Sequence, residues 1–363
     1  MKVLFVISCL NYGGAEKNLM LVANHFNKIG HDVAICNFNE RETVQHVCHE
    51  VKYYEKTDVY EKTGKFAWIG MRKQQYEFLK LCCRDFKPDI IISFLGMPNF
   101  LSILCGKILG IPVVISERAD PYRFNSKLDK IMHFVYNYAD GAVFQSDGAK
   151  NFYSGRLQKR SAVISNPVMH VKEEYCYDLK QTDKVIAFAG RFETVQKRQD
   201  IMLEAMKLVL KKHPDYKLVF YGDGENEEEI KNLASDMKIN ENVIFAGVSD
   251  NLVRDISKCE IYAITSDYEG IPNTLLEAMT IGMPCVSTDC SPGGAKMLVD
   301  NGINGTLVPC GDVSAIAEAI NYYIENKSVA VAHGKEAKKI KDKFDYDVIM
   351  EKWNSYILGV IGK

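Results

Sequence analysis

Short runs of apolar, often β-branched residues alternate along the whole chain with longer stretches in which apolar residues recur at helical spacing. Many of the short runs are continuously apolar, which is typical of strands buried on both faces of a parallel sheet. The alternation predicts repeated βα units and an α/β fold class. The predicted strands of the first half are Lys2–Ser8, Val33–Phe38, Ile90–Phe94, Val113–Glu117, Gly141–Gln145 and Ala162–Ser165. Those of the second half are Val185–Gly190, Lys217–Gly222, Val243–Gly247, Ile261–Thr265, Cys285–Thr288 and Gly305–Val308.

The chain is long enough for two domains, because 363 residues exceed the size at which a single hydrophobic core stops growing. Each half holds one set of predicted strands, so we expect two Rossmann-like sheets. We place the boundary after Pro167, between a predicted strand and the polar segment His170–Lys184. The predicted domains are residues 1–167 and 168–345. Open parallel sheets bind ligands beyond the carboxyl ends of their strands, so the loops after the strands are the place to look for chemistry.

The composition is that of an ordinary globular enzyme, with 47% hydrophobic and 25% charged residues. Its 11 cysteines are scattered and form no Cys-x-x-Cys pair, which favours reduced thiols over a disulfide framework or a zinc site. The first eight residues read as a strand and not as a signal peptide, and no apolar run is long enough to span a bilayer. These features predict a cytoplasmic protein.

Charge is distributed unevenly. Residues 1–170 carry 22 Lys and Arg against 16 Asp and Glu, whereas the remainder carries 23 against 31. A basic first half suits an acidic partner such as a phospholipid surface or a diphosphate lipid. The basic residues are spread out and not gathered in one stripe, which argues against a nucleic-acid partner.

Residues 56–87 combine eight Lys or Arg with interleaved aromatic residues. Cations that snorkel beside aromatic rings suit a membrane interface, so this segment is a candidate for peripheral membrane contact. A solvated helix that packs by its aromatic side would carry the same pattern. The aromatic residues are Tyr60, Phe66, Trp68, Tyr76 and Phe78.

One stretch, Thr265 to Asp289, has the clearest local order. A strand is followed by a loop with Gly270, and a short helix then ends at Gly282 before the next strand. Asn273 and Thr274 are residue types that favour helix N-caps. This order delivers backbone N–H groups and the positive end of a helix to one point, where a phosphate group would bind.

Two carboxylates flank that point, Glu269 in the loop and Glu277 on the helix. Taken alone, Glu277 could form a capping box with Thr274, and Glu269 could be an ordinary loop carboxylate. Within Glu-Gly-Ile-Pro-Asn-Thr-Leu-Leu-Glu-Ala-Met, followed by Gly-Met-Pro, the pair resembles the signature of the retaining glycosyltransferases of family 4, which have the GT-B fold. The resemblance implies that Glu269 faces the donor sugar and Glu277 holds the ribose. It further implies donor binding by Gly270, Ile271, Pro272, Asn273 and Thr274.

A second loop, Gly190–Lys197, places Arg191 and Lys197 after a predicted strand. Fixed cations can stabilise the negative charge that develops on a leaving diphosphate. Two solvated residues at a helix start are the alternative. The pair resembles the diphosphate clamp of the family, although its spacing is about one residue longer. The resemblance implies that Arg191, Lys197 and Glu269 are the catalytic residues.

Other loops resemble the family less specifically. Gly13 and Gly14 follow the first strand, where the family places donor and acceptor, although a plain βα turn would also use them. They belong to neither a dinucleotide fingerprint nor a Walker loop. By the same resemblance, Gly222 lies beside the nucleoside and Val248 reads the base, although turn chemistry alone explains such glycines.

Many family members carry a histidine near the reacting centre at this point of the chain. Here Glu117 and Arg118 replace it, which resembles the branch of the family that assembles bacterial surface polysaccharides. We take them as acceptor-side candidates, with an internal ion pair as the alternative. Asp345-Tyr-Asp347 has the D-x-D form of a metal motif, but it begins the last predicted helix and is interpreted as a cap. The eight histidines show no metal spacing, so we predict no metal and no cofactor.

The resemblance therefore implies two facing domains with the last helix, residues 346–363, returning to the first. It implies metal-independent, retaining transfer of a hexose or N-acetylhexosamine from a UDP-sugar to a glycan acceptor, which we expect to be linked to polyprenyl diphosphate. The site of action would be the cytoplasm or the inner face of the cell membrane. A nucleotide-sugar 2-epimerase of the same fold and a non-catalytic partner subunit are alternatives. A nicotinamide oxidoreductase would need the missing glycine fingerprint.

Overall fold

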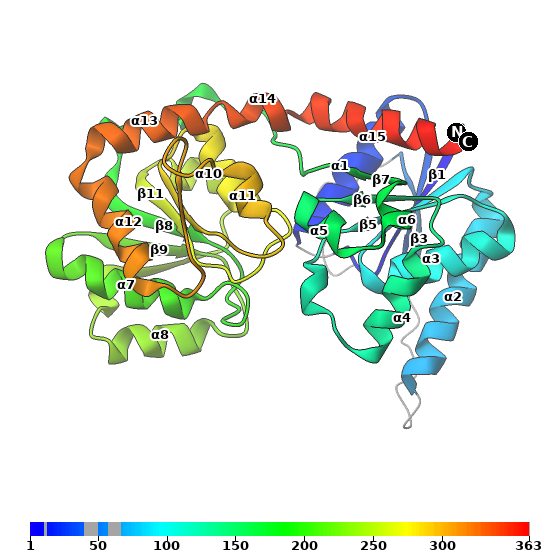
Figure 1. Cartoon of the computed structure of the whole chain (residues 1–363), viewed down its shortest axis with the longest axis horizontal. Helices are drawn as coiled ribbons and strands as arrows, with labels where there is room; N and C mark the ends of the chain where they lie inside the picture. The colour runs from blue at the N-terminus through cyan, green and yellow to red at the C-terminus, as the bar shows by residue number, and fades with distance from the viewer. Residues whose placement is uncertain (11–12, 40–49, 57–66, 363) are drawn as a thin grey trace. The chain divides into compact units, whose positions relative to one another are not determined.

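The computed structural model describes residues 1–10, 13–39, 50–56 and 67–362, which form two compact units (Figure 1). Unit 1 comprises Met1–Pro167 together with Asp347–Lys363, and unit 2 comprises Val168–Tyr346. Each unit is built around its own parallel sheet with helices on both faces. Among the described residues, no helix combines the length and apolar character needed to cross a bilayer.

Unit 1 contains a seven-stranded parallel sheet in the order β3-β2-β1-β4-β5-β6-β7. Its strands are β1 (Lys2–Ile7), β2 (Asp32–Asn37), β3 (Lys52–Glu55), β4 (Ile90–Phe94), β5 (Val113–Glu117), β6 (Gly141–Phe144) and β7 (Ser161–Val163). Its helices are α1 (Gly14–Lys28), α2 (Ala67–Phe86), α3 (Gly96–Leu109), the 3₁₀ turn η1 (Pro121–Arg123), α4 (Lys127–Tyr136), α5 (Asp147–Phe152) and α6 (Gly155–Gln158). Helix α15 (Tyr346–Ile361) crosses into unit 1 at its second residue.

Alternate residues of β1 serve the two faces of this sheet, as the strand period requires. Leu4 and Val6 belong to a buried cluster with side chains of α2, α3 and α4. On the other face, Phe5 packs edge-on against Phe26 of α1, with ring centroids 6.2 Å apart. Burial of both faces explains the continuously apolar strands of the sequence.

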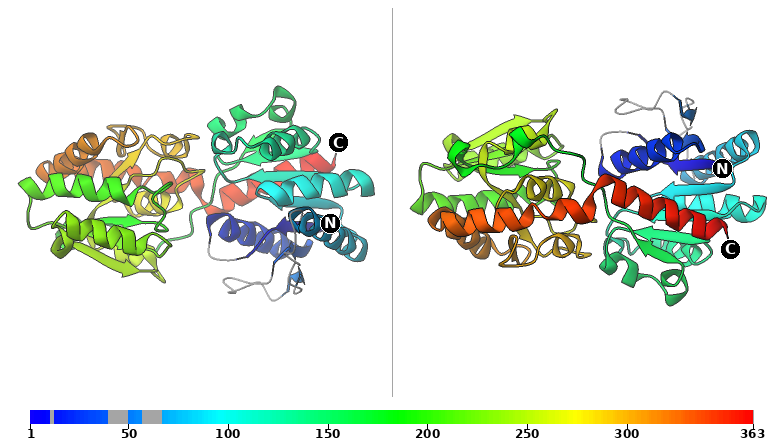
Figure 2. Two further views of the ribbon diagram at one scale, coloured as in Figure 1. Left: turned by 90° about the horizontal axis from the view of Figure 1, so that it is seen from below. Right: turned by 90° about the horizontal axis from the view of Figure 1, so that it is seen from above.

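Helix α15 lies beside α1 on the same side of this sheet (Figures 1 and 2). Its Trp353 is fully buried and stacks on Phe94 of β4, with ring centroids 6.1 Å apart. The Tyr356 hydroxyl accepts a hydrogen bond from the Ala142 backbone N–H at 2.8 Å. Burying one tryptophan, about 150–250 Å² of surface, contributes about 4–6 kcal/mol. This anchor holds the end of the chain on unit 1.

Unit 2 contains a six-stranded parallel sheet in the order β10-β9-β8-β11-β12-β13. Its strands are β8 (Asp183–Ala189), β9 (Lys217–Tyr221), β10 (Val243–Gly247), β11 (Cys259–Ile264), β12 (Cys285–Thr288) and β13 (Thr306–Val308). Its helices are α7 (Gln199–Lys212), α8 (Glu227–Asp236), α9 (Leu252–Ile256), α10 (Asn273–Ile281), α11 (Gly294–Leu298), α12 (Val313–Glu325), α13 (Lys327–Ala337) and α14 (Ile340–Phe344). Short 3₁₀ turns are η2 (Glu173–Tyr175), η3 (Leu179–Gln181) and η4 (Asn240–Asn242).

The predicted α/β class is therefore confirmed, and each predicted strand overlaps an observed one. Strand β3 was not predicted. It reads Lys-Tyr-Tyr-Glu, is at most half-buried and pairs only with β2, so it lacks the apolar signal of the inner strands. Part of the predicted membrane-contact segment, residues 57–66, lies outside the described residues. Within the rest, Tyr76 and Phe78 pack against the buried cluster of unit 1, whereas Trp68 is exposed.

Candidate active site

The frame of the site in unit 2 is β11, the loop after it, and α10. Every residue of β11 is buried, so the loop starts from a rigid element. Helix α10 begins after Pro272, whose backbone is extended and which provides no side-chain cap. The helix ends at Gly282, which adopts the left-handed conformation with φ of +89°. The predicted end of the helix is thus confirmed.

The predicted N-cap is wrong, because Asn273 and Thr274 both lie inside the first turn of α10. The Thr274 hydroxyl instead donates to the Ala189 carbonyl at 3.1 Å, which ties the start of α10 to the end of β8. Thr274 is therefore not the cap of a capping box with Glu277, which lies half-buried one turn further on. The first turn of α10 presents the positive end of its helix dipole without a capping side chain.

Glu269 is buried and held from several directions. The Ser266 hydroxyl donates to its Oε1 at 2.9 Å, and the Gln196 amide donates to its Oε2 at 3.4 Å. The Lys197 ammonium forms an ion pair with Oε1. The backbone N–H of Glu269 donates to the Ser291 carbonyl at 2.8 Å. This carboxylate therefore has one defined position.

The Lys197–Glu269 pair joins two predicted site residues that are 72 positions apart. The side chain of Lys197 is 21% exposed and that of Glu269 is 10% exposed, so the pair is largely removed from water. An ammonium group has three N–H donors, so a bond to Glu269 leaves donors for a second anion. Arg191 and Lys197 are about one residue further apart in the chain than in the family's clamp, but Lys197 still reaches Glu269 in the loop after β11.

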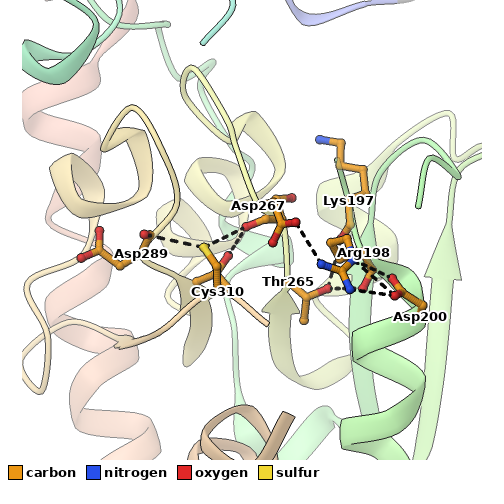
Figure 3. A network of polar contacts seen from close by, with 9 residues as sticks. Lys197, Arg198, Asp200, Thr265, Asp267, Asp289 and Cys310 are labelled. Atoms are coloured by element: carbon orange, nitrogen blue, oxygen red, sulfur yellow. Dashed lines mark hydrogen bonds and ion pairs between the residues drawn. The ribbon is translucent and has the colours of Figure 1, made fainter. Parts of the chain in front are cut away.

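A neighbouring network fixes the backbone that carries Lys197 (Figure 3). Arg198 donates to both carboxylate oxygens of Asp200 and, through Nη1, to Asp267 at 2.9 Å. The bond to Asp200 is the main cause that raises the pKa of Arg198. Thr265 donates to the Arg198 carbonyl at 2.8 Å. In this view the amino end of Lys197 points away from the network; it forms its ion pair with Glu269.

Sequence reasoning did not identify Arg198, Gln196 or Ser266. Arg198 is one of the few non-glycine residues with positive φ, at 54°, a conformation that surrounding contacts must enforce. Its partner Asp267 is 69 positions away, and such pairs leave no local pattern. The only feature of the sequence that could have drawn attention to Arg198, Gln196 and Ser266 is that they lie close in the chain to Lys197 or Glu269.

Arg191 follows β8 and its side chain is exposed. Its backbone is nevertheless fixed, because the buried Gln199 donates to the Arg191 carbonyl at 2.7 Å. The next residue, Phe192, is buried and donates its N–H to the Asp223 carbonyl at 2.7 Å. A solvent-facing guanidinium on a rigid turn suits an anion that arrives from solution.

Gly222, after β9, lies between the turns that follow β8 and β10. Its N–H donates to the Gly247 carbonyl at 2.8 Å. A Cβ at Gly222 would lie 2.2 Å from the Gly190 carbonyl oxygen, and its φ is +135°, so only glycine fits. Val248, the residue after Gly247, is 60% exposed. The predicted donor residues of unit 2 thus follow β8, β9, β10 and β11 at one edge of the sheet.

In unit 1, Gly13 and Gly14 begin α1 close to the end of β1. Gly13 is the N-cap and has extended backbone, with no side-chain cap. The three atoms nearest to a Cβ there belong to the carboxylate of Glu16, which is the end of a flexible side chain. Gly13 therefore provides no side-chain cap at the start of α1, and the assignment of Gly13 and Gly14 to donor and acceptor stays a prediction.

Glu117 is the last residue of β5 and Arg118 follows it; both are buried. Glu117 accepts the backbone N–H groups of Arg118 and Ala119 at 3.0 and 3.2 Å. The Arg118 side chain donates to Ser116 at 2.8 Å and to Asn166 at 3.0 Å. No side-chain hydrogen bond joins Glu117 and Arg118 among the described residues, but their opposite charges still attract each other.

Burial raises the pKa of Glu117 to about 7, although the backbone donors oppose this shift. The Arg118 guanidinium lies 5.1 Å from the ring centroid of Phe94 and 5.6 Å from that of Trp353. Its Nη2 is buried and has no hydrogen-bond partner among the described residues. An arginine stays charged in such surroundings, so a buried positive charge lies directly after β5.

Among the described residues, no three His, Cys, Asp or Glu side chains are grouped as metal ligands would be. The Asp345-Tyr-Asp347 motif lies where the chain passes from unit 2 into α15.

Comparisons with known proteins cover both units. The family model described as Glycosyltransferase Family 4 matches residues 12–170. The model described as Glycosyl transferases group 1 matches residues 176–340. The solved structure of Anabaena HepE in complex with UDP and glucose has a TM-score of 0.80 at 18% identity, covering 98% of this chain and 99% of that chain.

Two curated bacterial relatives match over nearly their whole length. One is GalNAc-alpha-(1->4)-GalNAc-alpha-(1->3)-diNAcBac-PP-undecaprenol alpha-1,4-N-acetyl-D-galactosaminyltransferase of Campylobacter jejuni, 27% identical over 363 residues and 99% of each chain. The other is lipopolysaccharide 1,6-galactosyltransferase of Escherichia coli, 24% identical over 91% of this chain and 97% of that protein. The chain therefore belongs to glycosyltransferase family 4 and has the GT-B fold of two Rossmann-like domains, as its sequence motifs predict.

Proposed function

We propose that this glycosyltransferase moves a hexose or N-acetylhexosamine from a UDP-sugar to a glycan acceptor carried on a lipid diphosphate, with retention of the anomeric configuration. The observation that carries the proposal is the convergence of Lys197 and Glu269 beside the uncapped start of α10. A cation, a fixed carboxylate and a helix N-terminus are the groups that a diphosphate linked to a sugar requires.

Each donor residue then has a role set by its surroundings. Arg191 and Lys197 bind the diphosphate together with backbone N–H groups of Gly270, Ile271, Asn273 and Thr274, and they stabilise the charge that develops as the diphosphate leaves. Glu269, which Ser266 and Gln196 hold in place, accepts hydrogen bonds from donor-sugar hydroxyls and orients the anomeric carbon.

The nucleoside lies on the remaining turns of the same edge. Glu277 accepts hydrogen bonds from the ribose hydroxyls, and Val248 offers an exposed apolar contact beside the base. Gly222 allows the backbone of its turn to approach closely, because any side chain would strike the turn after β8. Gly14 is assigned to the donor diphosphate by family resemblance.

The reaction needs no resident cofactor in this proposal, since charge stabilisation comes from Arg191, Lys197 and the α10 N-terminus. The acceptor hydroxyl attacks the anomeric carbon, the bond from that carbon to the diphosphate oxygen breaks, and UDP leaves. The acceptor proton passes to a diphosphate oxygen. Gly13, Glu117 and Arg118 are assigned to the acceptor side by family resemblance.

The relatives support the choice of substrates. The Campylobacter protein is named for transferring N-acetylgalactosamine to a glycan on undecaprenol diphosphate, and HepE was solved with UDP and glucose. We therefore expect a UDP-sugar donor and a polyprenyl-diphosphate-linked acceptor, and a protein that acts at the inner face of the membrane.

The test is a transfer assay with UDP-linked glucose, galactose, N-acetylglucosamine and N-acetylgalactosamine and undecaprenyl-diphosphate glycans, in the presence of a chelator. We expect UDP release matched by a new glycoside whose anomeric configuration, read by NMR, equals that of the donor. Glu269→Ala should lower transfer by about 10²-fold or more while UDP still binds. Glu241→Ala, an exposed glutamate on η4, is the matched control and should leave both unchanged.

Equal and large losses of UDP affinity and turnover in Glu269→Ala would contradict its sugar-facing role. An inverted product would remove the retaining mechanism. Conversion of the UDP-sugar without a glycoside product would identify an epimerase instead.

A further inference from the structure

The backbone of Arg198 has a conformation that arginine rarely adopts. Its φ is 54° and its ψ is 48°, in the left-handed region that favours glycine. Four non-glycine residues in the described part of the chain have positive φ, and Arg198 is the one beside the site of unit 2. Strain of this kind persists only where the surroundings hold it, and it gathers at functional sites. The contacts of the Arg198 side chain are therefore the place to look for a role.

The Arg198 guanidinium lies between two carboxylates that come from different elements (Figure 3). Its Nη2 donates to Asp200, in the first turn of α7, at 2.9 Å, and its Nη1 donates to Asp267, in the loop after β11, at 2.9 Å. The three side chains are between 22% and 28% exposed, so water screens their charges only in part. The rigid fork of a guanidinium suits such a bridge.

Neutral hydrogen bonds join the same two segments. The Asp267 N–H donates to the Gln196 carbonyl at 2.8 Å. The Thr265 hydroxyl lies within hydrogen-bond distance of two carbonyls, that of Lys197 at 3.1 Å and that of Arg198 at 2.8 Å. The turn that carries Lys197 and the loop after β11 are thus fastened at several points, and the ion pair from Arg198 to Asp267 adds a charged tie between them.

We propose that Arg198 is a positioning residue for glycosyl transfer, which holds the loop after β11 against the turn that carries Lys197. Arg198 directly follows Lys197 in the chain, and Asp267 precedes Glu269 by two residues. The bond from Arg198 to Asp267 therefore acts close to both members of the Lys197–Glu269 pair. A misplacement of about 1 Å in a catalytic group can cost about 10²-fold in turnover, so a bond that fixes the pair should show in kcat.

The effect on turnover rests on the proposed function, whereas the effect on the Lys197–Glu269 pair does not depend on any reaction. Arg198 also balances charge, because without it Asp200 and Asp267 would lie uncompensated in the part of unit 2 where we place a diphosphate. Position and charge can be separated by a second substitution. Arg198→Gly/Asp267→Asn removes one positive and one negative charge, which leaves the net charge of the wild type but no tie between the two segments.

The experiment measures kcat for transfer and the affinity for UDP in three variants of the full chain. Glycine adopts positive φ without strain, so Arg198→Gly removes the side chain and keeps the turn. It should lower kcat by about tenfold or more and UDP affinity by about threefold, because Arg191 and the start of α10 still bind the diphosphate. Arg198→Gly/Asp267→Asn should bind UDP to within about twofold of the wild type, while its kcat stays lower by about tenfold or more. Asp267→Asn, which keeps Arg198 and a neutral hydrogen bond, should lower kcat by about threefold or more.

A second readout needs no substrate. A double-mutant cycle of Lys197→Met and Glu269→Gln in urea unfolding measures the coupling between these two side chains. In the Arg198→Gly background this coupling should fall to about half of its wild-type value or less. Lys231→Ala is the matched control, because it also removes a cation that two carboxylates of unit 2 contact, Glu227 at 2.9 Å and Glu228 at 2.7 Å. This control should leave kcat, UDP affinity and the coupling unchanged.

An unchanged kcat or an unchanged coupling in Arg198→Gly would overturn the proposal. Recovery of kcat together with UDP affinity in Arg198→Gly/Asp267→Asn would also overturn it, because Arg198 would then act through its charge alone. Asp267→Asn decides by the same two readouts if Arg198→Gly does not fold. If the wild type forms no glycoside with any donor, the proposed reaction is contradicted and the coupling alone decides. A fall by about half then supports Arg198 as the residue that positions the Lys197–Glu269 pair, and an unchanged coupling overturns that role.

Discussion

Gly294→Ala tests how the site loop is supported. Gly294 begins α11, and a Cβ at this position would lie 1.9 Å from the carbonyl oxygen of Gly270 and 3.1 Å from that of Glu269. Real Cβ contacts essentially never fall under 3.0 Å, so α11 and the loop must separate by about 1.1 Å. The atoms that the methyl group meets are backbone, and no side-chain rotation can relieve the contact.

The cost follows from this geometry. Overpacking by one methyl group against rigid neighbours costs about 1–3 kcal/mol, and a backbone contact belongs at the upper end of that range. We therefore expect Gly294→Ala to lower the free energy of unfolding of unit 2 by about 2–3 kcal/mol. A shift of about 1 Å in the loop should also misplace Glu269 and the start of α10, which lowers UDP affinity by about tenfold or more.

The assay is urea unfolding combined with calorimetric titration of UDP. Gly359→Ala is the control, because a Cβ at Gly359 of α15 meets nothing within 4 Å and alanine is the better helix former. That control should raise stability by about 0.5–1 kcal/mol and leave UDP binding unchanged. If Gly294→Ala were as stable as the wild type and bound UDP equally well, the described packing of α11 against the loop would be refuted. A stability loss without a loss of UDP affinity would remove only the link to nucleotide binding.

Three further predictions concern charge and burial. Lys197→Met and Glu269→Gln should each destabilise unit 2, and a double-mutant cycle should give a coupling of about 1–3 kcal/mol; a coupling near zero would show that the pair does not form. Burial raises the pKa of Glu117 to about 7, so the folded state favours its protonated form. The corresponding stability is fully present below pH 4.5 and is lost as pH rises through 7, about 3 kcal/mol in all. Glu117→Gln should flatten this dependence in urea unfolding at pH 5 and pH 8, and a slope equal to that of the wild type would contradict the assignment. Trp353→Ala should cost about 3–5 kcal/mol and release α15 from unit 1, so unchanged protection of the α15 amides from hydrogen exchange would contradict its anchoring role.

Much of the fold could be predicted from the sequence because burial on both faces leaves a direct trace. Strands such as β4, Ile90–Phe94, are continuously apolar, and Gly282 marks the end of α10 because only glycine readily takes its left-handed backbone. Strand β3 escaped prediction because an edge strand needs little apolar surface. Local sequence patterns therefore identify the inner strands, which are buried on both faces, better than an edge strand.

The arrangement of the site was harder to predict because its contacts join distant parts of the chain. Lys197 and Glu269 could be selected as residue types, but their pairing depends on how β8 and β11 lie side by side. Thr274 has the chemistry of an N-cap, yet its hydroxyl bonds the carbonyl at the end of β8 instead. Arg198 was missed because its bond to Asp267 spans 69 residues.

A metal-independent UDP site in unit 2 is the central feature of the proposed reaction. The most direct measurement is calorimetric titration of the purified full chain with UDP, GDP, ADP and NAD in the presence of a chelator, repeated with Arg191→Ala. We predict that, without metal, UDP binds more tightly than the other three nucleotides and that Arg191→Ala lowers the affinity for UDP by about tenfold or more. Binding of NAD alone, binding of no nucleotide, or UDP binding that requires a metal would contradict it.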